Sequence, residues 1–287
     1  QLDDFTPGNL RIKAREITDH TAPYELVKTM RASVLVLGPL MAREGRADVS
    51  LPGGCAIGAR PIDQHLKGLE ALGATIELNN GYVQARADRL KGAEFTFDLN
   101  TVTGTENLIM AASLAKGTTV LKNCAIEPEV CELAHVINRM GGKVSGAGTT
   151  EIVIEGVDRL SGVVHEVMPD RIEAGTYIMA GAITKGDVTV EGCDPSHINS
   201  LLEKLGEAEL KLEISENSVR VVSNGPLRSC DVVTDPYPGF ATDFQAQYMA
   251  LMALGDTSCS ITEQVFENRF MHVSELSRMG ANIRVSG

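Results

Sequence analysis

The chain repeats one pattern of hydrophobic and polar positions four times. In each copy an apolar run with helical spacing ends at Leu or Met followed by Gly, and a short strand-like stretch comes next in most copies. The glycines are Gly73, Gly141, Gly206 and Gly280, so the spacings are 68, 65 and 74 residues. Because glycine adopts a left-handed backbone at little cost, it is the expected stop after an amphipathic helix.

A second landmark has the same period. Gly117, Gly186 and Gly255 each follow a run rich in Ala and Met and open a strand-like stretch, and both gaps are 69 residues. The three runs cover residues 108–114, 177–183 and 247–254. Together the landmarks predict strand–helix–strand–helix–strand units of about 68 residues and an α/β architecture. The alternative is that helix–Gly–strand junctions recur by chance, as they are common in α/β proteins.

The two ends of the chain fall inside this pattern. Residues 8–13 read as a strand in mid-unit, and the last residues follow directly on a helix–Gly–strand junction. We therefore expect a fragment of a longer protein.

Composition and charge narrow the class of protein. At 43% hydrophobic and 22% charged residues the chain is typical of a globular protein, and no apolar run reaches the roughly 18 residues that span a bilayer. A net charge of −12 argues against a nucleic-acid binder, which needs a basic surface. Residues 28–67 contain six Lys or Arg and three acids, which favours a cationic pocket for a small anion.

One of the six cysteines lies in a distinctive setting. Cys55 belongs to the stretch Ser-Leu-Pro-Gly-Gly-Cys-Ala-Ile-Gly-Ala-Arg at residues 50–60, whose Pro and glycines predict a mobile loop. Backbone N–H groups and nearby arginines lower the pKa of a thiol and make it a reactive acid or nucleophile. The alternative is an incidental loop cysteine. The other five are scattered without metal-ligand spacing, and we expect them to serve packing only.

This loop and four further blocks resemble a known family. The loop is similar to the catalytic loop of the UDP-N-acetylglucosamine 1-carboxyvinyltransferases, an enolpyruvyl transferase family. The other blocks that carry the resemblance cover residues 22–33, 169–176, 240–247 and 267–272, in the family's order. The resemblance implies an inside-out α/β barrel of the enolpyruvyl transferase type, built from the repeated units in two domains. We place the domains at residues 1–168 and 169–287.

The resemblance also implies roles for individual residues. Cys55 is the general acid that reacts with phosphoenolpyruvate and the target of fosfomycin. Asp243 is the carboxylate near the sugar 3-hydroxyl, although Thr-Asp before a helical run also fits a helix N-cap. The remaining substrate-binding residues are Arg31 and Arg60 for anions, Pro61, Ile62, Asp63 and Gln64 for the uridine, Val102, Thr103 and Gly104 for the diphosphate, and Val265 for the nucleotide sugar. His65 and Glu129 are possible neighbours of the active site.

The implied reaction transfers the enolpyruvyl group of phosphoenolpyruvate to the 3-hydroxyl of UDP-N-acetylglucosamine and releases phosphate, the first committed step of peptidoglycan synthesis in the bacterial cytoplasm. We expect no cofactor, no metal, no nucleic acid and no membrane. The fragment alone is expected to be inactive or barely active. The alternatives are a non-catalytic fragment that binds the UDP-sugar and a thiol hydrolase using Cys55 with His65.

Overall fold

The computed structural model describes residues 2–6, 8–51 and 62–286, which form two compact α/β units. The first unit contains the described residues up to Leu51 together with Ile62–Cys124 and Leu133–Gly162. The second contains Ala125–Glu132 and the described residues from Val163 onward. No helix among the described residues is both long and apolar enough to cross a membrane.

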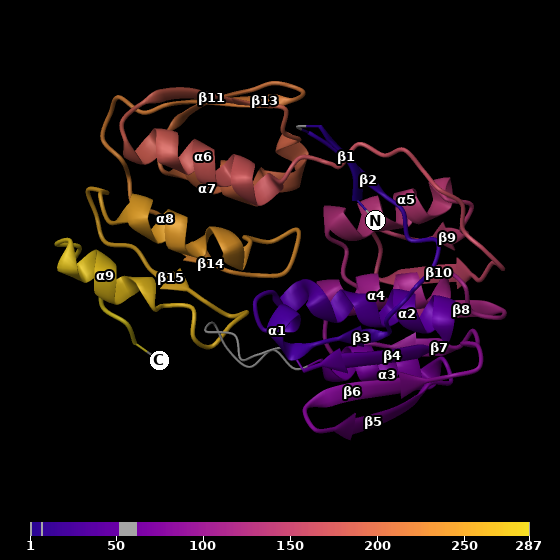
Figure 1. Ribbon diagram of the computed structural model, residues 1–287. Helices are drawn as coiled ribbons and strands as arrows, with labels where there is room; N and C mark the ends of the chain where they lie inside the picture. The colour runs from indigo at the N-terminus through magenta and orange to yellow at the C-terminus, as the bar shows by residue number, and fades with distance from the viewer. Residues whose placement is uncertain (1, 7, 52–61, 287) are drawn as a thin grey trace. The chain divides into compact units, whose positions relative to one another are not determined.

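The first unit is built from two copies of one motif (Figure 1). In the sheets β3-β4-β6-β5 and β7-β8-β10-β9, the first two strands are parallel and the remaining pairs are antiparallel. The elements are β1 (Leu2–Thr6), β2 (Asn9–Ile12), β3 (Thr21–Ala22), α1 (Tyr24–Val27), η1 (Arg31–Val36), α2 (Leu37–Glu44), β4 (Arg46–Ser50), α3 (Asp63–Ala71), β5 (Thr75–Asn79), β6 (Tyr82–Arg86), β7 (Glu94–Thr96), α4 (Val102–Ala112), β8 (Thr118–Lys122), α5 (Pro128–Arg139, whose first residues belong to the second unit), β9 (Val144–Ser145) and β10 (Glu151–Glu155).

Burial alternates along the central strands of these sheets. In β6 and β10 every second residue is buried, so one face of each sheet packs inward and the other meets solvent. Helix α4 is the inner element, because it contacts both α2 and α3 and its central residues Leu108 and Ile109 are fully buried. The helices therefore lie on the inner side of the unit and the sheets on the outer side, as expected for an inside-out α/β barrel.

The second unit contains two partial copies of the motif. Its sheets are β11-β13-β12, antiparallel throughout, and the parallel pair β14-β15. Helix α6 packs against β11, β13 and α8, around a core that includes Phe244 and Tyr248 (Figure 1). The elements are α6 (Arg171–Ile183), β11 (Asp187–Glu191), η2 (Pro195–Ile198), α7 (Asn199–Glu207), β12 (Lys211–Ile214), β13 (Ser218–Val222), β14 (Val232–Val233), η3 (Thr242–Phe244), α8 (Gln245–Met252), β15 (Ile261–Thr262) and α9 (His272–Arg278).

The predicted repeat is confirmed, with one correction to the helix stops. Gly73, Gly141 and Gly280 have φ of +91°, +95° and +102°, as expected for left-handed residues that end a helix. Gly206 does not end its helix, because α7 continues to Glu207 and the left-handed residue is Glu209, with φ +64°. The spacings of the true stops are then 68, 68 and 71 residues, more regular than the glycines alone indicate.

Candidate functional site

The predicted site residues that the structure describes fall into two groups, one in each unit. Cys55, Arg60 and Pro61 lie outside the described residues. In the first unit are Arg31, residues 62–65 and residues 102–104. In the second are Asp243, Val265 and Glu129.

The start of α3 is fixed by the side chain of Gln64, which is 3% exposed. Its Oε1 accepts from the backbone N–H of Asp98 at 2.9 Å, and its Nε2 donates to carboxylate oxygens of Asp98 and Asp63, both at 2.9 Å. The buried Ile62 precedes the helix directly. Because these bonds join α3 to the segment after β7, they hold the backbone of residues 62–64 in one place.

The start of α4 holds the predicted diphosphate residues. Thr101 is the N-cap, and its hydroxyl accepts from the backbone N–H of Gly104 at 3.2 Å. A Cβ on Gly104 would lie 2.4 Å from Cγ2 of Thr101, so the cap needs glycine here. The cap already uses the Gly104 N–H, which leaves the N–H groups of Val102 and Thr103 at the positive end of the helix to interact with an anion.

His65 lies on α3 between these groups and is 3% exposed. Its Nδ1 is 2.8 Å from Nδ2 of Asn107, and its Nε2 is 3.4 Å from the hydroxyl of Thr103. Burial, helped by the positive charge of Arg31, lowers the pKa of His65 to about 4, while Asp63 acts in the opposite direction. The structure therefore brings Arg31, His65 and Thr103 together around a neutral imidazole.

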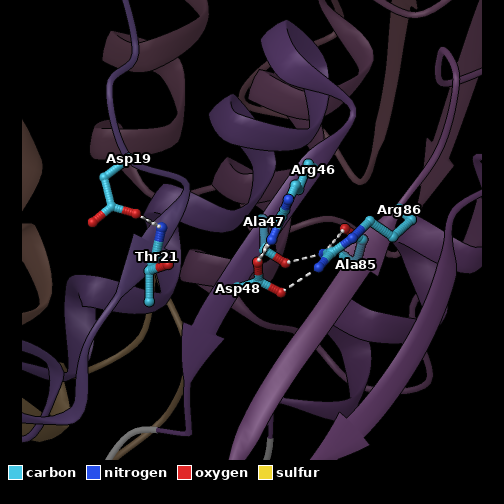
Figure 2. A network of polar contacts seen from close by, with 7 residues as sticks. All are labelled: Asp19, Thr21, Arg46, Ala47, Asp48, Ala85 and Arg86. Atoms are coloured by element: carbon cyan, nitrogen blue, oxygen red, sulfur yellow. Dashed lines mark hydrogen bonds and ion pairs between the residues drawn. The ribbon is translucent and has the colours of Figure 1, made fainter.

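Most of the cations counted in residues 28–67 already have acidic or backbone partners. Lys28 pairs with Glu25, and Lys67 pairs with Asp98 at 2.6 Å. Arg46 and Arg86 converge on the carboxylate of Asp48 at 3.0 and 2.6 Å (Figure 2).

Asp48 lies on β4, the strand that leads to the predicted catalytic loop. Burial alone would raise the pKa of Asp48, but its hydrogen bonds with Arg86 and Arg46 outweigh burial and lower it. These arginines therefore stabilise the sheet.

In the second unit, Asp243 is held by an arginine. Nη2 of Arg269 donates to Oδ1 of Asp243, and Nη1 of Arg269 donates to the hydroxyl of Thr242 at 3.2 Å. Asp243 is not a helix cap: the N-cap of η3 is Ala241, and neither η3 nor α8 has a side-chain cap bond. The carboxylate is therefore oriented by a cation, and within the described part of the chain its other oxygen, Oδ2, accepts no hydrogen bond.

Glu263 organises the residues around Asp243 and was missed by sequence reasoning. Its Oε1 accepts from the Thr234 hydroxyl and the Val265 N–H, both at 2.8 Å, and its Oε2 accepts from the Thr242 hydroxyl at 2.8 Å. One carboxylate thus fixes the turn that carries Val265 and the residue next to Asp243. Sequence reasoning missed Glu263 because its hydroxyl partners, Thr242 and Thr234, are 21 and 29 positions away.

Glu129 belongs to a second acidic group in this unit. Its Oε1 accepts from Nε of Arg171 at 2.9 Å, and the guanidinium of Arg171 lies 5.5 Å from the ring centre of Tyr237. Neighbouring Glu127 is 7% exposed, and burial raises its pKa. Among the described residues, Oε2 of Glu127 and Oε2 of Glu129 have no hydrogen-bond partner.

The larger cavity described in the first unit, of about 1250 Å³, is separate from these groups. It is lined by residues 12–15 and by parts of α2, α4 and α5, and none of the predicted site residues lines it. Its size therefore does not identify it as the site.

The five described cysteines fit the expected packing role. Cys124, Cys193 and Cys230 are buried, while Cys131 and Cys259 are half-buried, and all five are free thiols. Burial raises the pKa of each, that of Cys124 to about 12. They are poor candidates for a reactive thiolate at neutral pH.

Comparison with solved structures defines the fold. The chain is similar to the enolpyruvyl transferase NikO from Streptomyces tendae, with a TM-score of 0.80 and 21% identity over 93% of this chain and 64% of that one. It is also similar to EPSP synthase from Acinetobacter baumannii, with a TM-score of 0.60 and 19% identity over 85% of this chain and 58% of that one. The repeats and these similarities show that the chain has the enolpyruvyl transferase fold.

Sequence comparison gives the family. The family model described as EPSP synthase (3-phosphoshikimate 1-carboxyvinyltransferase) matches residues 7–287. A UDP-N-acetylglucosamine 1-carboxyvinyltransferase of Desulforapulum autotrophicum is 58% identical over 98% of this chain and 67% of its own length. Proteins of that name from Anaeromyxobacter sp. and Acidobacterium capsulatum are 60% and 58% identical, over 98% and 96% of this chain and 67% and 64% of their own lengths.

The chain belongs to the UDP-N-acetylglucosamine 1-carboxyvinyltransferase family of enolpyruvyl transferases. It spans about two thirds of the length of the curated relatives that it matches.

Proposed function

We propose that this chain carries most of the machinery that transfers the enolpyruvyl group of phosphoenolpyruvate to the 3-hydroxyl of UDP-N-acetylglucosamine. The observation that supports this most strongly is an identity of 58–60% over nearly the whole chain to relatives named for that nucleotide sugar. We also propose a cytoplasmic location, a role in bacterial peptidoglycan synthesis, and a domain division at residues 168/169.

The first unit is proposed to bind the nucleotide sugar. Residues 61–64 contact the uridine, and the side chain of Gln64 holds the backbone of residues 62–64 in place. The N–H groups of Val102 and Thr103 face the diphosphate, with Arg31 and Arg60 adding positive charge. Guanidinium groups suit this role because they stay charged and offer paired donors to phosphate oxygens.

The reaction is proposed to proceed by addition and elimination. The 3-hydroxyl oxygen bonds to C2 of phosphoenolpyruvate as Asp243 takes up the hydroxyl proton, while Cys55 donates a proton to C3. The tetrahedral adduct then loses a proton from C3 and the phosphate from C2, which leaves the enol ether. The pairing of Asp243 with Arg269 supports an oriented acceptor at the hydroxyl, because a fixed carboxylate loses little entropy on reaction.

The test measures phosphate release from phosphoenolpyruvate and UDP-N-acetylglucosamine. Because the chain spans about two thirds of its relatives, the assay uses both the chain alone and a chimaera in which the chain replaces the matching segment of the D. autotrophicum protein. We expect turnover that requires both substrates in the chimaera and little in the chain alone. A folded chimaera without turnover contradicts the proposal.

Mass spectrometry after treatment with fosfomycin gives a second readout. We expect the covalent label on Cys55 and its loss in Cys55→Ser. A label on another residue contradicts the role of Cys55. The alternative function is a non-catalytic domain that binds the UDP-sugar. It is favoured if calorimetry detects binding of the nucleotide sugar and the chimaera releases no phosphate.

A further inference from the structure

A fully buried asparagine in the first unit joins three segments that lie far apart in the sequence. Asn107 on α4 is 0% exposed. Its Oδ1 accepts from the backbone N–H of Gly38 at 2.7 Å, and its Nδ2 lies 3.3 Å from the carbonyl oxygen of Val34 and 2.8 Å from Nδ1 of His65. The fit is close, because a Cβ on Gly38 would lie 2.3 Å from that Oδ1.

These backbone partners fix which way the amide of Asn107 faces. The N–H of Gly38 is a donor, so the atom beside it must be the amide oxygen. The carbonyl of Val34 is an acceptor, so the atom beside it must be the amide nitrogen. Turning the amide over would place donor against donor and acceptor against acceptor in a buried site, which is costly.

The orientation of Asn107 in turn fixes the proton of His65. Because Nδ2 of Asn107 donates, Nδ1 of His65 must accept and carries no proton. The proton of the neutral imidazole then lies on Nε2, which is 3.4 Å from the hydroxyl oxygen of Thr103. The charged groups that act on His65 are Arg31, which disfavours a second proton, and Asp63, which favours it.

Thr103, in the first turn of α4, accepts the hydrogen bond from Nε2 of His65. Once its oxygen accepts from His65, its own hydroxyl proton is directed to another acceptor. Thr103 is half-buried and belongs to the positive end of a helix of 11 residues, beside the N–H groups proposed for the diphosphate. An anionic oxygen bound there would be the natural acceptor.

We propose that Asn107 is a positioning residue that, through the Nε2–H tautomer of His65, sets the hydroxyl of Thr103 to donate to a phosphate oxygen of the nucleotide sugar. This proposal rests on the proposed function for its ligand, while the relay itself stands on the contacts of the first unit. It assigns His65 a fixed hydrogen-bonding role.

The relay is tested by NMR of the 287-residue chain with 15N-labelled histidine, with the His65 signals identified by His65→Gln. We expect a nonprotonated Nδ1 and a protonated Nε2 at pH 7. In Asn107→Asp an oxygen faces Nδ1, so the proton should move to Nδ1 and the titration midpoint of His65 should rise. A protonated Nδ1 in the unsubstituted chain overturns the relay, and so does a folded Asn107→Asp variant with an unchanged tautomer. The measurement on the unsubstituted chain decides the point even if that variant does not fold.

The ligand arm uses calorimetry with UDP-N-acetylglucosamine. Thr103→Val removes the hydroxyl at constant shape and should weaken binding about 10-fold, the usual effect of losing a hydrogen bond to a charged group. Thr103→Ser should restore most of the affinity, and Thr75→Val, on exposed β5, should leave it unchanged. Equal affinity of Thr103→Val and the unsubstituted chain overturns the role of Thr103. If the unsubstituted chain binds no nucleotide sugar, the proposed function is contradicted and this ligand with it, while the NMR result still decides the relay.

Discussion

At the scale of single residues, His65 makes folding stability depend on pH. Its pKa falls from 6.5 to about 4 on folding, so between these values the unfolded chain takes up a proton that the folded protein refuses. The free energy of unfolding therefore decreases as the pH falls from 6.5 toward 4. The pKa shift corresponds to a total loss of roughly 3 kcal/mol. Urea unfolding of the chain at pH 7, 5.5 and 4.5 measures this loss.

The matched control for this prediction is His65→Gln, whose amide oxygen can still accept from Asn107. Its stability should change much less across the same range, because glutamine does not titrate. Parallel curves for the two proteins would show that groups other than His65 cause the loss and that His65 has an ordinary pKa.

Asp243 and Arg269 form a residue pair whose two members should have unequal effects on catalysis. Asp243→Asn removes the proton acceptor, and we expect phosphate release by the chimaera to fall roughly 100-fold or more. Arg269→Gln leaves the carboxylate in place without its orienting cation, so the loss should be smaller. Asp243→Asn should not prevent folding, since Asp243 is exposed.

Arg278→Gln is the control for Arg269→Gln. Arg278 pairs with Glu275 on α9, and its side chain is 77% exposed. The chimaera that carries Arg278→Gln should be as active as the unsubstituted chimaera. If Arg278→Gln and Arg269→Gln lose activity equally, the effect of Arg269 is not due to its contact with Asp243.

At the scale of elements, one helix stop in the second unit can be improved. The N–H of Leu210 donates to the carbonyl of Leu205 and that of Glu209 to Gly206, the same pair of bonds that Ala74 and Gly73 make in the first repeat. Because Glu209 has φ +64°, Glu209→Gly should relieve backbone strain and stabilise the second unit by about 1 kcal/mol. The cost of losing its contact with Arg228 is small, since both side chains are more than 60% exposed.

Gly141→Ala provides the opposite test in the first unit. Gly141 has φ +95° and open space where a Cβ would lie, so alanine should destabilise by about 1 kcal/mol through the backbone alone. Thermal unfolding measures both changes: the melting temperature should rise in Glu209→Gly and fall in Gly141→Ala. A lower melting temperature for Glu209→Gly would contradict the assignment of Glu209 as the helix stop.

The repeat shows what the hydrophobic pattern predicts and where it fails. Apolar periodicity locates the helices of all four copies, because burial of one face is a local requirement of each helix. The preference for glycine as the left-handed residue predicts the third helix stop at Gly206. In the structure the left-handed residue that ends this helix is Glu209. The stop at Glu209 becomes visible only in the backbone hydrogen bonds of Leu210 and Glu209.

At the scale of the whole molecule, local motifs locate the candidate site better than they explain it. Residues 62–65 and 102–104 can be named from short blocks of sequence, and the structure places both blocks in one unit around His65. The contacts that organise them cannot be named in this way. Asn107 lies 42 positions from His65, and no local pattern links these two positions. The 69 positions between Gly38 and Asn107 equal one repeat, but the repeat does not indicate that their polar groups form a hydrogen bond.

Thiol chemistry tests the whole chain at once, because six cysteines compete for the same reagent. Burial raises the pKa of the five described thiols, so at pH 7 very little of each is thiolate. With Ellman's reagent we expect one fast-reacting cysteine in the native protein and six in denaturant. Cys55→Ser should remove the fast phase, whereas Cys259→Ser, at a half-buried position, should retain it. A fast phase that persists in Cys55→Ser would mean that another thiol is the reactive one, and the proposed chemistry would lose its acid.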